Sequence, residues 1–179
     1  MKAVKNVILT GSLHSGKSTL VQHALDALAF EYKGVFCQPI IQHKETLGYG
    51  IRLIGHKELH VFAHIDFQNS ERFDKYGLDL SPFFAAAHYI KENLDGRQKL
   101  FVIDEIGVIE QSVSEYLNAI DHLLGSPVPC LIVVQKRAAY LKTVEKRNDA
   151  VVLELENYNM MLERRMLNLL RDITGADML

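Results

Sequence analysis

Between residues 11 and 19 the chain reads Gly11-Ser12-Leu13-His14-Ser15-Gly16-Lys17-Ser18-Thr19. This stretch fits the pattern Gly-x-x-x-x-Gly-Lys-[Ser/Thr], which is the pattern of the phosphate-binding P-loop. An apolar, β-branched run over residues 4–9 precedes it and predicts a buried strand. Apolar residues at helical spacing follow it over 20–29 and predict a helix with one buried face. Strand, loop and helix therefore occur in the order that a P-loop requires.

We expect this loop to bind the phosphates of a nucleotide. Glycines at its two ends allow the backbone to curl, so that successive N–H groups point at phosphate oxygens, and the helix N-terminus adds its positive dipole end. Lys17 supplies a positive charge for the outer phosphates, and the Ser18 hydroxyl is suited to ligate Mg²⁺. The predicted nucleotide-binding residues are Gly11, Ser12, Leu13, His14, Ser15, Gly16, Lys17, Ser18 and Thr19. The alternative interpretation is an ordinary strand–turn–helix corner.

A second candidate segment is Leu100-Phe-Val-Ile-Asp-Glu105. Its apolar residues end in two acids, so the carboxylates stand at the carboxyl end of a buried strand, where open α/β sheets bind ligands. Asp104 is suited to hold the Mg²⁺ shell, and Glu105 to orient or activate an attacking water. The alternative is a strand that ends in a polar turn. The upstream P-loop favours the functional interpretation, because it supplies the phosphate and Mg²⁺ that the acids need.

The composition is ordinary for a globular protein. The 179 residues are 48% hydrophobic and 23% charged, with a formal net charge of −2. We expect a single domain over residues 1–179. The near-neutral charge gives no electrostatic argument for nucleic acid or a membrane surface as a main partner, and no apolar run approaches a membrane span. The absence of a signal peptide, together with Cys37 and Cys130 in separate apolar runs that favour reduced thiols, predicts a cytoplasmic protein.

The rest of the chain alternates predicted strands and helices. This alternation predicts an α/β fold with a mostly parallel central sheet flanked by helices and joined by right-handed crossovers. Two apolar runs around Gly55 predict an inserted antiparallel hairpin. The expected elements are strands at 34–38, 130–134 and 151–155, hairpin runs at 51–53 and 59–65, helices at 82–94, 114–124, 138–147 and 158–170, and loops at 39–50 and 68–79.

Four further side chains are weaker candidates. His60 and His64 could form a metal pair, but no third ligand stands at zinc spacing, so we favour an interpretation as ordinary polar histidines. Gln135 follows a buried strand and could sense the terminal phosphate, while Arg137 could reach a phosphate. A solvated run of polar residues is an equally good interpretation of this last segment.

The motifs together support a family resemblance. The chain resembles the small nucleoside-triphosphatase family first known from thermophiles, a family that includes the human cancer-related nucleoside-triphosphatase. The resemblance covers most of the chain and rests on the P-loop, on Lys75-Tyr-Gly-Leu-Asp79, and on Val102-Ile-Asp-Glu-Ile-Gly107. The chain departs from the family in three places. Many members have Pro-Gly where this chain has Leu13-His14, and Lys-Met-Glu where it has Val108-Ile109-Glu110, and the stretch Gln135-Lys136-Arg137 fits the usual pattern poorly.

This resemblance implies a RecA-like P-loop fold and slow, Mg²⁺-dependent hydrolysis of several nucleoside triphosphates. At matching positions it assigns phosphate binding to Gly16, Lys17 and Ser18, metal support to Asp104, and water activation to Glu105. Arg72 lies near an arginine that the family tends to carry before Lys-Tyr-Gly, which makes it a further catalytic candidate.

The leading hypothesis is thus a phosphohydrolase that converts a nucleoside triphosphate and water to diphosphate and phosphate, with Lys17, Glu105 and Arg72 as catalytic candidates. One alternative is a nucleotide or small-molecule kinase, which would use the same P-loop and need an acceptor pocket. Another is a nucleotide-dependent switch that acts through a protein partner. Base selectivity is expected to be poor, because the chain has no guanine-reading motif such as Asn-Lys-x-Asp.

Overall fold

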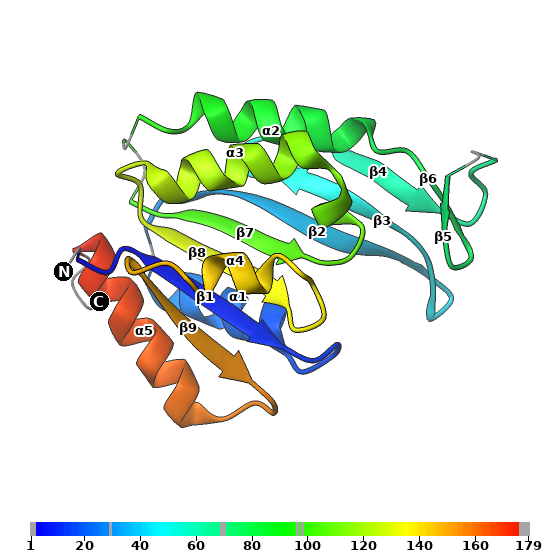
Figure 1. Cartoon of the computed structure of the whole chain (residues 1–179). Coiled ribbons are helices and arrows are strands. Elements are labelled where there is room, and N and C mark those ends of the chain that lie inside the picture. The colour runs from blue at the N-terminus through cyan, green and yellow to red at the C-terminus, as the bar shows by residue number, and fades with distance from the viewer. Residues whose placement is uncertain (1–2, 29, 69–70, 96, 98, 176–179) are drawn as a thin grey trace.

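The computed structural model describes residues 3–28, 30–68, 71–95, 97 and 99–175. Over these residues, the elements are β1 (Asn6–Gly11), α1 (Lys17–Leu28), β2 (Lys33–Gln42), β3 (Glu45–Leu53), β4 (Leu59–His64), β5 (Arg72–Phe73), β6 (Tyr76–Leu78), α2 (Ser81–Glu92), β7 (Phe101–Ile106), the 3-10 turn η1 (Glu110–Ser112), α3 (Ser114–Gly125), β8 (Cys130–Gln135), α4 (Leu141–Val144), β9 (Ala150–Leu155) and α5 (Met160–Thr174). The strands form one mixed sheet in the order β5-β6-β4-β3-β2-β7-β8-β1-β9, and helices cover both of its faces (Figure 1).

The parallel half of the sheet carries the predicted motifs. β1 lies between β8 and β9, and both pairings are parallel along its whole length, from Asn6 opposite Cys130 and Ala150. All six β1 residues are buried, as expected for a strand covered on both faces. β7 pairs with β8 on one side and with the first residues of β2 on the other. The fold class is therefore confirmed, and the carboxyl ends of β1, β7 and β8 meet at one edge.

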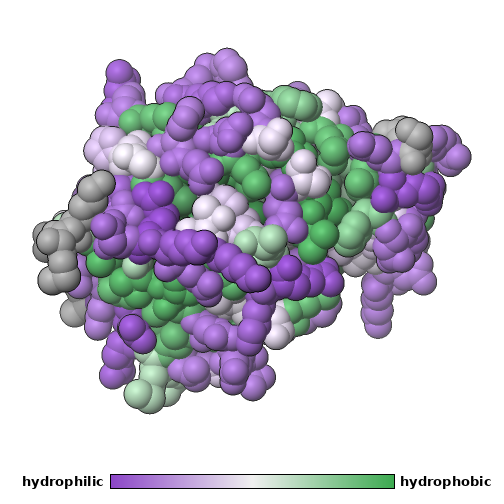
Figure 2. Space-filling model, in the orientation of Figure 1, coloured by the Kyte–Doolittle hydropathy of each residue, from purple (hydrophilic) through white to green (hydrophobic). Residues whose placement is uncertain are grey.

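The helices divide into two layers. α2 and α3 pack on one face, where Phe83, Tyr116 and Ile120 are among their buried side chains, and α1 and α5 pack on the other, where Leu20 and Met166 are buried. In the same view, hydrophilic residues predominate on the helix surfaces that face the reader, and hydrophobic residues show between the elements (Figure 2). Each helix thus buries one apolar stripe against the sheet.

The antiparallel half is larger than the expected hairpin. β2, β3, β4, β6 and β5 form this continuous antiparallel half, in which β4 pairs with β6 and β5 lies at the outer edge. The loop expected at 39–50 is wrong, because β2 runs on to Gln42 and β3 begins at Glu45. The two residues between them, His43 and Lys44, have φ values of 49° and 69°, which is the left-handed backbone of a two-residue hairpin turn. A short β5–β6 hairpin likewise replaces part of the expected 68–79 loop, in which residues 69 and 70 lie outside the described chain.

We expect that replacing His43-Lys44 by Asn-Gly stabilises the protein by about 1 kcal/mol, because side chains other than Gly and Asn are disfavoured in the left-handed region. Urea denaturation is the measurement, and the midpoint should rise with an unchanged slope. The control makes the same two changes, His88→Asn and Lys91→Gly, at exposed positions of helix α2. These changes should instead lower the urea midpoint, because Asn and Gly are poor helix formers. An unchanged or lower midpoint for the turn variant would contradict the prediction.

The helix expected at 138–147 is also shorter than predicted, since only Leu141–Val144 is helical. No helix among the described residues is long and apolar enough to cross a membrane. Cys130 is buried and Cys37 is half-buried, and both are free thiols, as predicted.

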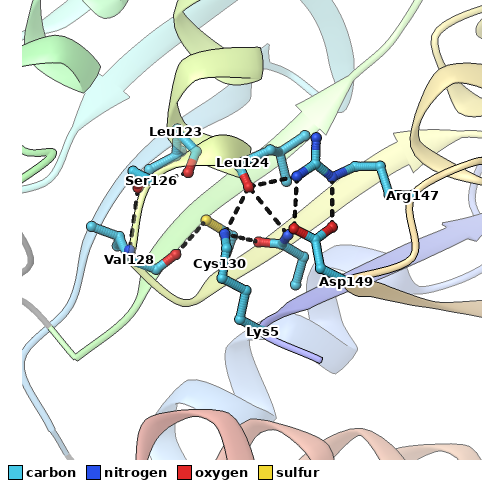
Figure 3. A network of polar contacts seen from close by, with 9 residues as sticks. Lys5, Leu123, Leu124, Ser126, Val128, Cys130, Arg147 and Asp149 are labelled. Atoms are coloured by element: carbon cyan, nitrogen blue, oxygen red, sulfur yellow. Dashed lines mark hydrogen bonds and ion pairs between the residues drawn. The ribbon is translucent and has the colours of Figure 1, made fainter. Parts of the chain in front are cut away.

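A polar network ties the amino-terminal end of β1 to the end of α3 (Figure 3). The backbone oxygen of Leu124 accepts from Lys5 Nζ at 2.7 Å and from an Arg147 nitrogen at 2.7 Å. Arg147 also donates to both carboxylate oxygens of Asp149, each at 2.9 Å. Burial raises the pKa of Asp149 and the Arg147 hydrogen bonds lower it, and the net pKa lies below the usual value. The charged carboxylate therefore stabilises this corner of the sheet.

We expect Asp149→Asn to destabilise the protein at neutral pH by about 1–3 kcal/mol, because it weakens charge-assisted hydrogen bonds. Since the folded pKa is lowered, the stabilisation is complete above the unfolded pKa, about 3.9, and is lost as pH falls below that value towards the folded pKa. The gap in urea midpoint between the wild type and the variant should therefore narrow below about pH 4. Asp66→Asn, at a carboxylate that is 82% exposed, is the control. A gap that stays constant down to pH 2 would contradict the assignment.

Candidate functional site

A cleft of about 680 Å³ lies at the carboxyl edge of the parallel strands. The P-loop forms one side of it, since every residue from Leu13 to Thr19 lines the cleft. Glu105 at the end of β7 and Gln135 at the end of β8 also line it. The structure thus brings the P-loop and the predicted strand-end residues into one site, as the sequence indicates.

The P-loop places its lysine inward. Lys17 is the first residue of α1 and is only 5% exposed. Its Nζ donates to the backbone oxygens of Ser12 at 2.9 Å and of Gly11 at 3.4 Å, so the loop wraps around the ammonium group. Gly16 has a φ of 93° and His14 a φ of 59°. His14 therefore occupies a left-handed position that favours glycine, at the place where many family members carry one.

Ser18 and Asp104 lie together below the loop. The Ser18 hydroxyl donates to Asp104 Oδ1 at 3.2 Å, which links the start of α1 to β7. Asp104 is buried, and burial raises its pKa to about 7, although the Ser18 hydrogen bond lowers it and the neighbouring Glu105 raises it further. This buried carboxylate lies beside a hydroxyl and has little positive charge around it. The pair is therefore suited to bind a cation that prefers oxygen ligands.

Glu105 lies at the centre of the polar contacts. Its Oε2 is 3.6 Å from Lys17 Nζ, and its Oε1 accepts a hydrogen bond from Gln135 Nε2. The Oε1 of Gln135 in turn accepts from Arg137 Nε at 3.3 Å. Gln135 thus fixes the orientation of the Glu105 carboxylate, and both Gln135 and Arg137 line the cleft.

The sequence analysis did not predict one acid of the site. Glu110, in η1, is buried and lines the cleft, and its Oε2 accepts from the Gly107 backbone N–H at 2.9 Å. Burial raises its pKa to about 7, and the nearby Glu105 raises it further. Cys37, on β2, also lines the cleft. The sequence did hold one indication of a role for Glu110, because it matches the last residue of the Lys-Met-Glu segment of the family.

The other candidates lie elsewhere. The Arg72 guanidinium donates to the backbone oxygen of Lys75 at 3.0 Å, and the neighbouring residues Phe73 and Asp74 reach the cleft in its place. His64 lies 3.5 Å from an Asp66 carboxylate oxygen. Among the residues that the structure describes, no group of three or more His, Cys, Asp or Glu side chains could hold a metal ion.

The site combines a strand–loop–helix with an enclosed lysine, a serine at the helix start, and two acids at the end of β7, which β8 separates from β1. This combination defines a nucleoside-triphosphatase of the P-loop class. The comparison with family models agrees, since the NTPase family model matches residues 6–170. The chain therefore belongs to the NTPase family.

Relatives and solved structures of this family match nearly the whole chain. Nucleoside-triphosphatase THEP1 of Natranaerobius thermophilus is 26% identical over 157 residues, covering 86% of this chain and 89% of that protein. THEP1 of Methanopyrus kandleri is 23% identical over 147 residues, covering 80% and 81%. The crystal structure of THEP1 from Aquifex aeolicus has a TM-score of 0.74 at 22% identity, covering 92% of this chain and 98% of that one. The solution structure of a human cancer-related nucleoside triphosphatase has a TM-score of 0.70 at 22% identity, covering 96% of each.

Proposed function

We propose that the protein hydrolyses nucleoside triphosphates to diphosphate and phosphate in a Mg²⁺-dependent reaction, as one cytoplasmic domain with little selectivity for the base. The observation that carries this proposal is the 3.6 Å distance between Lys17 Nζ and Glu105 Oε2. A cation for the outer phosphates and a carboxylate for the attacking water thus face the same small space.

Each side chain has a separate role in the proposed reaction. The P-loop amides and Lys17 bind the outer phosphates and offset the charge that builds up as the bond to the β,γ-bridging oxygen breaks. Glu105 orients the attacking water or accepts its proton. Gln135 holds the Glu105 carboxylate through the hydrogen bond to Oε1. We assign no step to Arg72, whose guanidinium is engaged by Lys75.

Ser18 and Asp104 fit a magnesium ion. Mg²⁺ prefers hydroxyl and carboxylate oxygens and keeps several waters, and these two groups are held 3.2 Å apart beside the P-loop. The buried Asp104 lacks a full positive partner, as its raised pKa of about 7 reflects. When bound there, the ion would neutralise charge on the β- and γ-phosphates.

Low turnover is part of the proposal. P-loop enzymes hydrolyse slowly when no arginine contacts the transferred phosphate. Arg137 lines the cleft, but its Nε donates to Gln135, so we assign it no contact with the phosphate. A nucleotide switch with a protein partner would also be slow, so the rate alone does not separate the two functions.

The test is product analysis with each nucleoside triphosphate in turn, across a Mg²⁺ titration. We expect diphosphate and phosphate from purine and pyrimidine substrates alike, with activity lost when the metal is chelated. A preference above about a thousandfold would require a dedicated base pocket with buried polar partners and would contradict the predicted low selectivity. Activity that survives complete chelation would contradict the role of Mg²⁺.

A further inference from the structure

The cleft extends well beyond the P-loop and the two acids. β2 pairs with β7 only from Lys33 to Phe36, whereas it pairs with β3 from Val35 to its end at Gln42. The outer part of the β2–β3 hairpin therefore overhangs the carboxyl edge of the parallel strands (Figure 1). Residues from β2 to β6 form this side of the cleft, which we call the aromatic wall: Cys37, Pro39, Ile41, Thr46, Tyr49, Phe62, Phe73, Asp74 and Tyr76.

The rings of the aromatic wall are fixed by contacts with one another. The Tyr49 ring lies 5.5 Å from the Tyr76 ring in a T-shaped arrangement and 6.4 Å from Phe62 in a stacked one. The Tyr76 hydroxyl donates to the backbone oxygen of Thr46 at 3.2 Å. At the mouth, Ile41 is 63% exposed. Phe62 and Tyr76 are themselves buried, so they support the half-buried Tyr49. Rigid aromatic side chains bind flat apolar groups with little loss of conformational entropy, so Tyr49 and the exposed Ile41 offer a surface that suits a ring.

The aromatic wall lies on the side from which the γ-phosphate is attacked. In the strand order, β7 with Glu105 stands between β2 and β1, the strand that leads into the P-loop. In-line phosphoryl transfer requires the nucleophile and the leaving diphosphate on opposite sides of the phosphorus. A nucleophile beside Glu105 therefore places the nucleoside diphosphate on the P-loop side. The aromatic wall is left free for another molecule.

The charge of the aromatic wall restricts what this molecule can be. Of the described residues that β2 to β6 contribute to the cleft, none is Lys, Arg or His, and Asp74 is exposed at the rim. A cation does lie beside the wall, because Lys75 Nζ is 5.4 Å from the centroid of the Tyr76 ring. The buried Glu110 lies in the same cleft. With this one cation set against the two acids, an anionic phosphate group gains no net attraction here, and an uncharged ring is favoured by comparison.

We propose that the aromatic wall is a second subsite, which binds an uncharged alcohol with a flat ring, such as a nucleoside, as an acceptor of the γ-phosphoryl group. This inference rests on the proposed function, because it uses the same bound triphosphate. In the transfer, the alcohol oxygen bonds to the γ-phosphorus and the bond from that phosphorus to the β,γ-bridging oxygen breaks. The hydroxyl proton passes to the Glu105 carboxylate. The products are a phosphate monoester and a nucleoside diphosphate.

The test begins with binding. The triphosphate site of the full-length protein is first filled with Mg²⁺ and guanosine 5′-(β,γ-imido)triphosphate, and this step is followed by calorimetry. The four ribonucleosides and pyridoxine are then titrated in, each beside its monophosphate. We expect at least one neutral compound to bind while the analogue stays bound, and its monophosphate to bind at least about tenfold more weakly. With GTP in place of the analogue, phosphorus NMR should show a new phosphate monoester.

Variants at an exposed position test the location without disturbing the core. Ile41→Lys places a cation on the aromatic wall, so it should shift the binding preference towards the monophosphate by at least about tenfold. Phe84→Lys is the matched control, because Phe84 is also an exposed apolar residue, at 56%, but lies on α2 and outside the cleft. It should leave the preference unchanged.

Three results would overturn the subsite. The first is that no neutral compound binds below about 10 mM, a free energy weaker than about −2.7 kcal/mol. The second is that the neutral compound displaces the guanosine analogue, which would make the aromatic wall the base pocket of the triphosphate. The third is that both lysine variants behave alike. Failure of the proposed function is distinguishable, since GTP without an acceptor would then release no free phosphate in the phosphorus NMR measurement, whether or not a neutral compound binds.

Discussion

Glu105→Gln should lower the single-turnover rate of hydrolysis at least about a hundredfold while the affinity for Mg²⁺-triphosphate stays within a fewfold. The amide keeps the shape of the carboxylate but loses its charge and basicity, and general-base assistance is worth about a hundred- to ten-thousandfold in rate. The neighbouring Lys17 and the Ser18–Asp104 pair are unchanged by this substitution, so binding has no reason to fail. Single-turnover hydrolysis across a Mg²⁺ titration is the measurement.

Two matched variants make this result specific. Asp104→Asn should fail differently, through a weaker response to Mg²⁺, because it removes charge from the metal shell. Glu92→Gln, at an acid of α2 that is 62% exposed, is the control for a change from acid to amide and should turn over normally. If Glu105→Gln turns over normally, or is rescued by added Mg²⁺, the roles of the two acids are wrong.

Lys17→Ala should weaken binding of a non-hydrolysable triphosphate about ten- to hundredfold and abolish turnover. The loss of one charge-assisted contact is worth about 1.5–3 kcal/mol, and 1.4 kcal/mol corresponds to a factor of about ten. The side chain is enclosed by the loop oxygens of Gly11 and Ser12, so Lys17→Met, which retains the length of the side chain, is the second variant. Calorimetric titration measures both.

A control for Lys17 is Lys142→Ala, because Lys142 lies on α4 at an exposed position. It should bind the analogue like the wild type. An affinity that is unchanged in both Lys17 variants, with the fold retained by circular dichroism, would mean that the loop does not hold phosphate.

The parallel half of the fold could be predicted because its sequence signals are local and agree with one another. β1, β7 and β8 are short strands, each with at least three consecutive apolar residues, and the P-loop between β1 and α1 fixes their direction. The acids that end β7 lie beside the P-loop because the carboxyl ends of parallel strands meet at one edge. This geometry follows from topology alone.

The antiparallel half was under-predicted because its turn has no distinctive residues. His43-Lys44 closes a tight hairpin without the Asn or Gly that usually marks one, and Pro39 favours a loop interpretation. Pro39 is tolerated because β2 has lost its β7 partner beyond Phe36 and pairs on one side only. The role of Glu110 could not be predicted either, since its importance depends on burial and on a backbone contact that only the folded chain creates.

The strand order also has a consequence for how the protein folds. In the antiparallel half, from β2 to β6, each strand pairs with one that is close to it in the chain, and only β5 separates β4 from its partner β6. In contrast, Asn6 of β1 pairs with Cys130 and Ala150, which are far away in the chain. Contacts between residues close in sequence form faster than distant ones. We therefore expect the antiparallel half to gain hydrogen-exchange protection first during refolding. The phosphate-binding loop should become ordered only after nearly all of the chain has been synthesised.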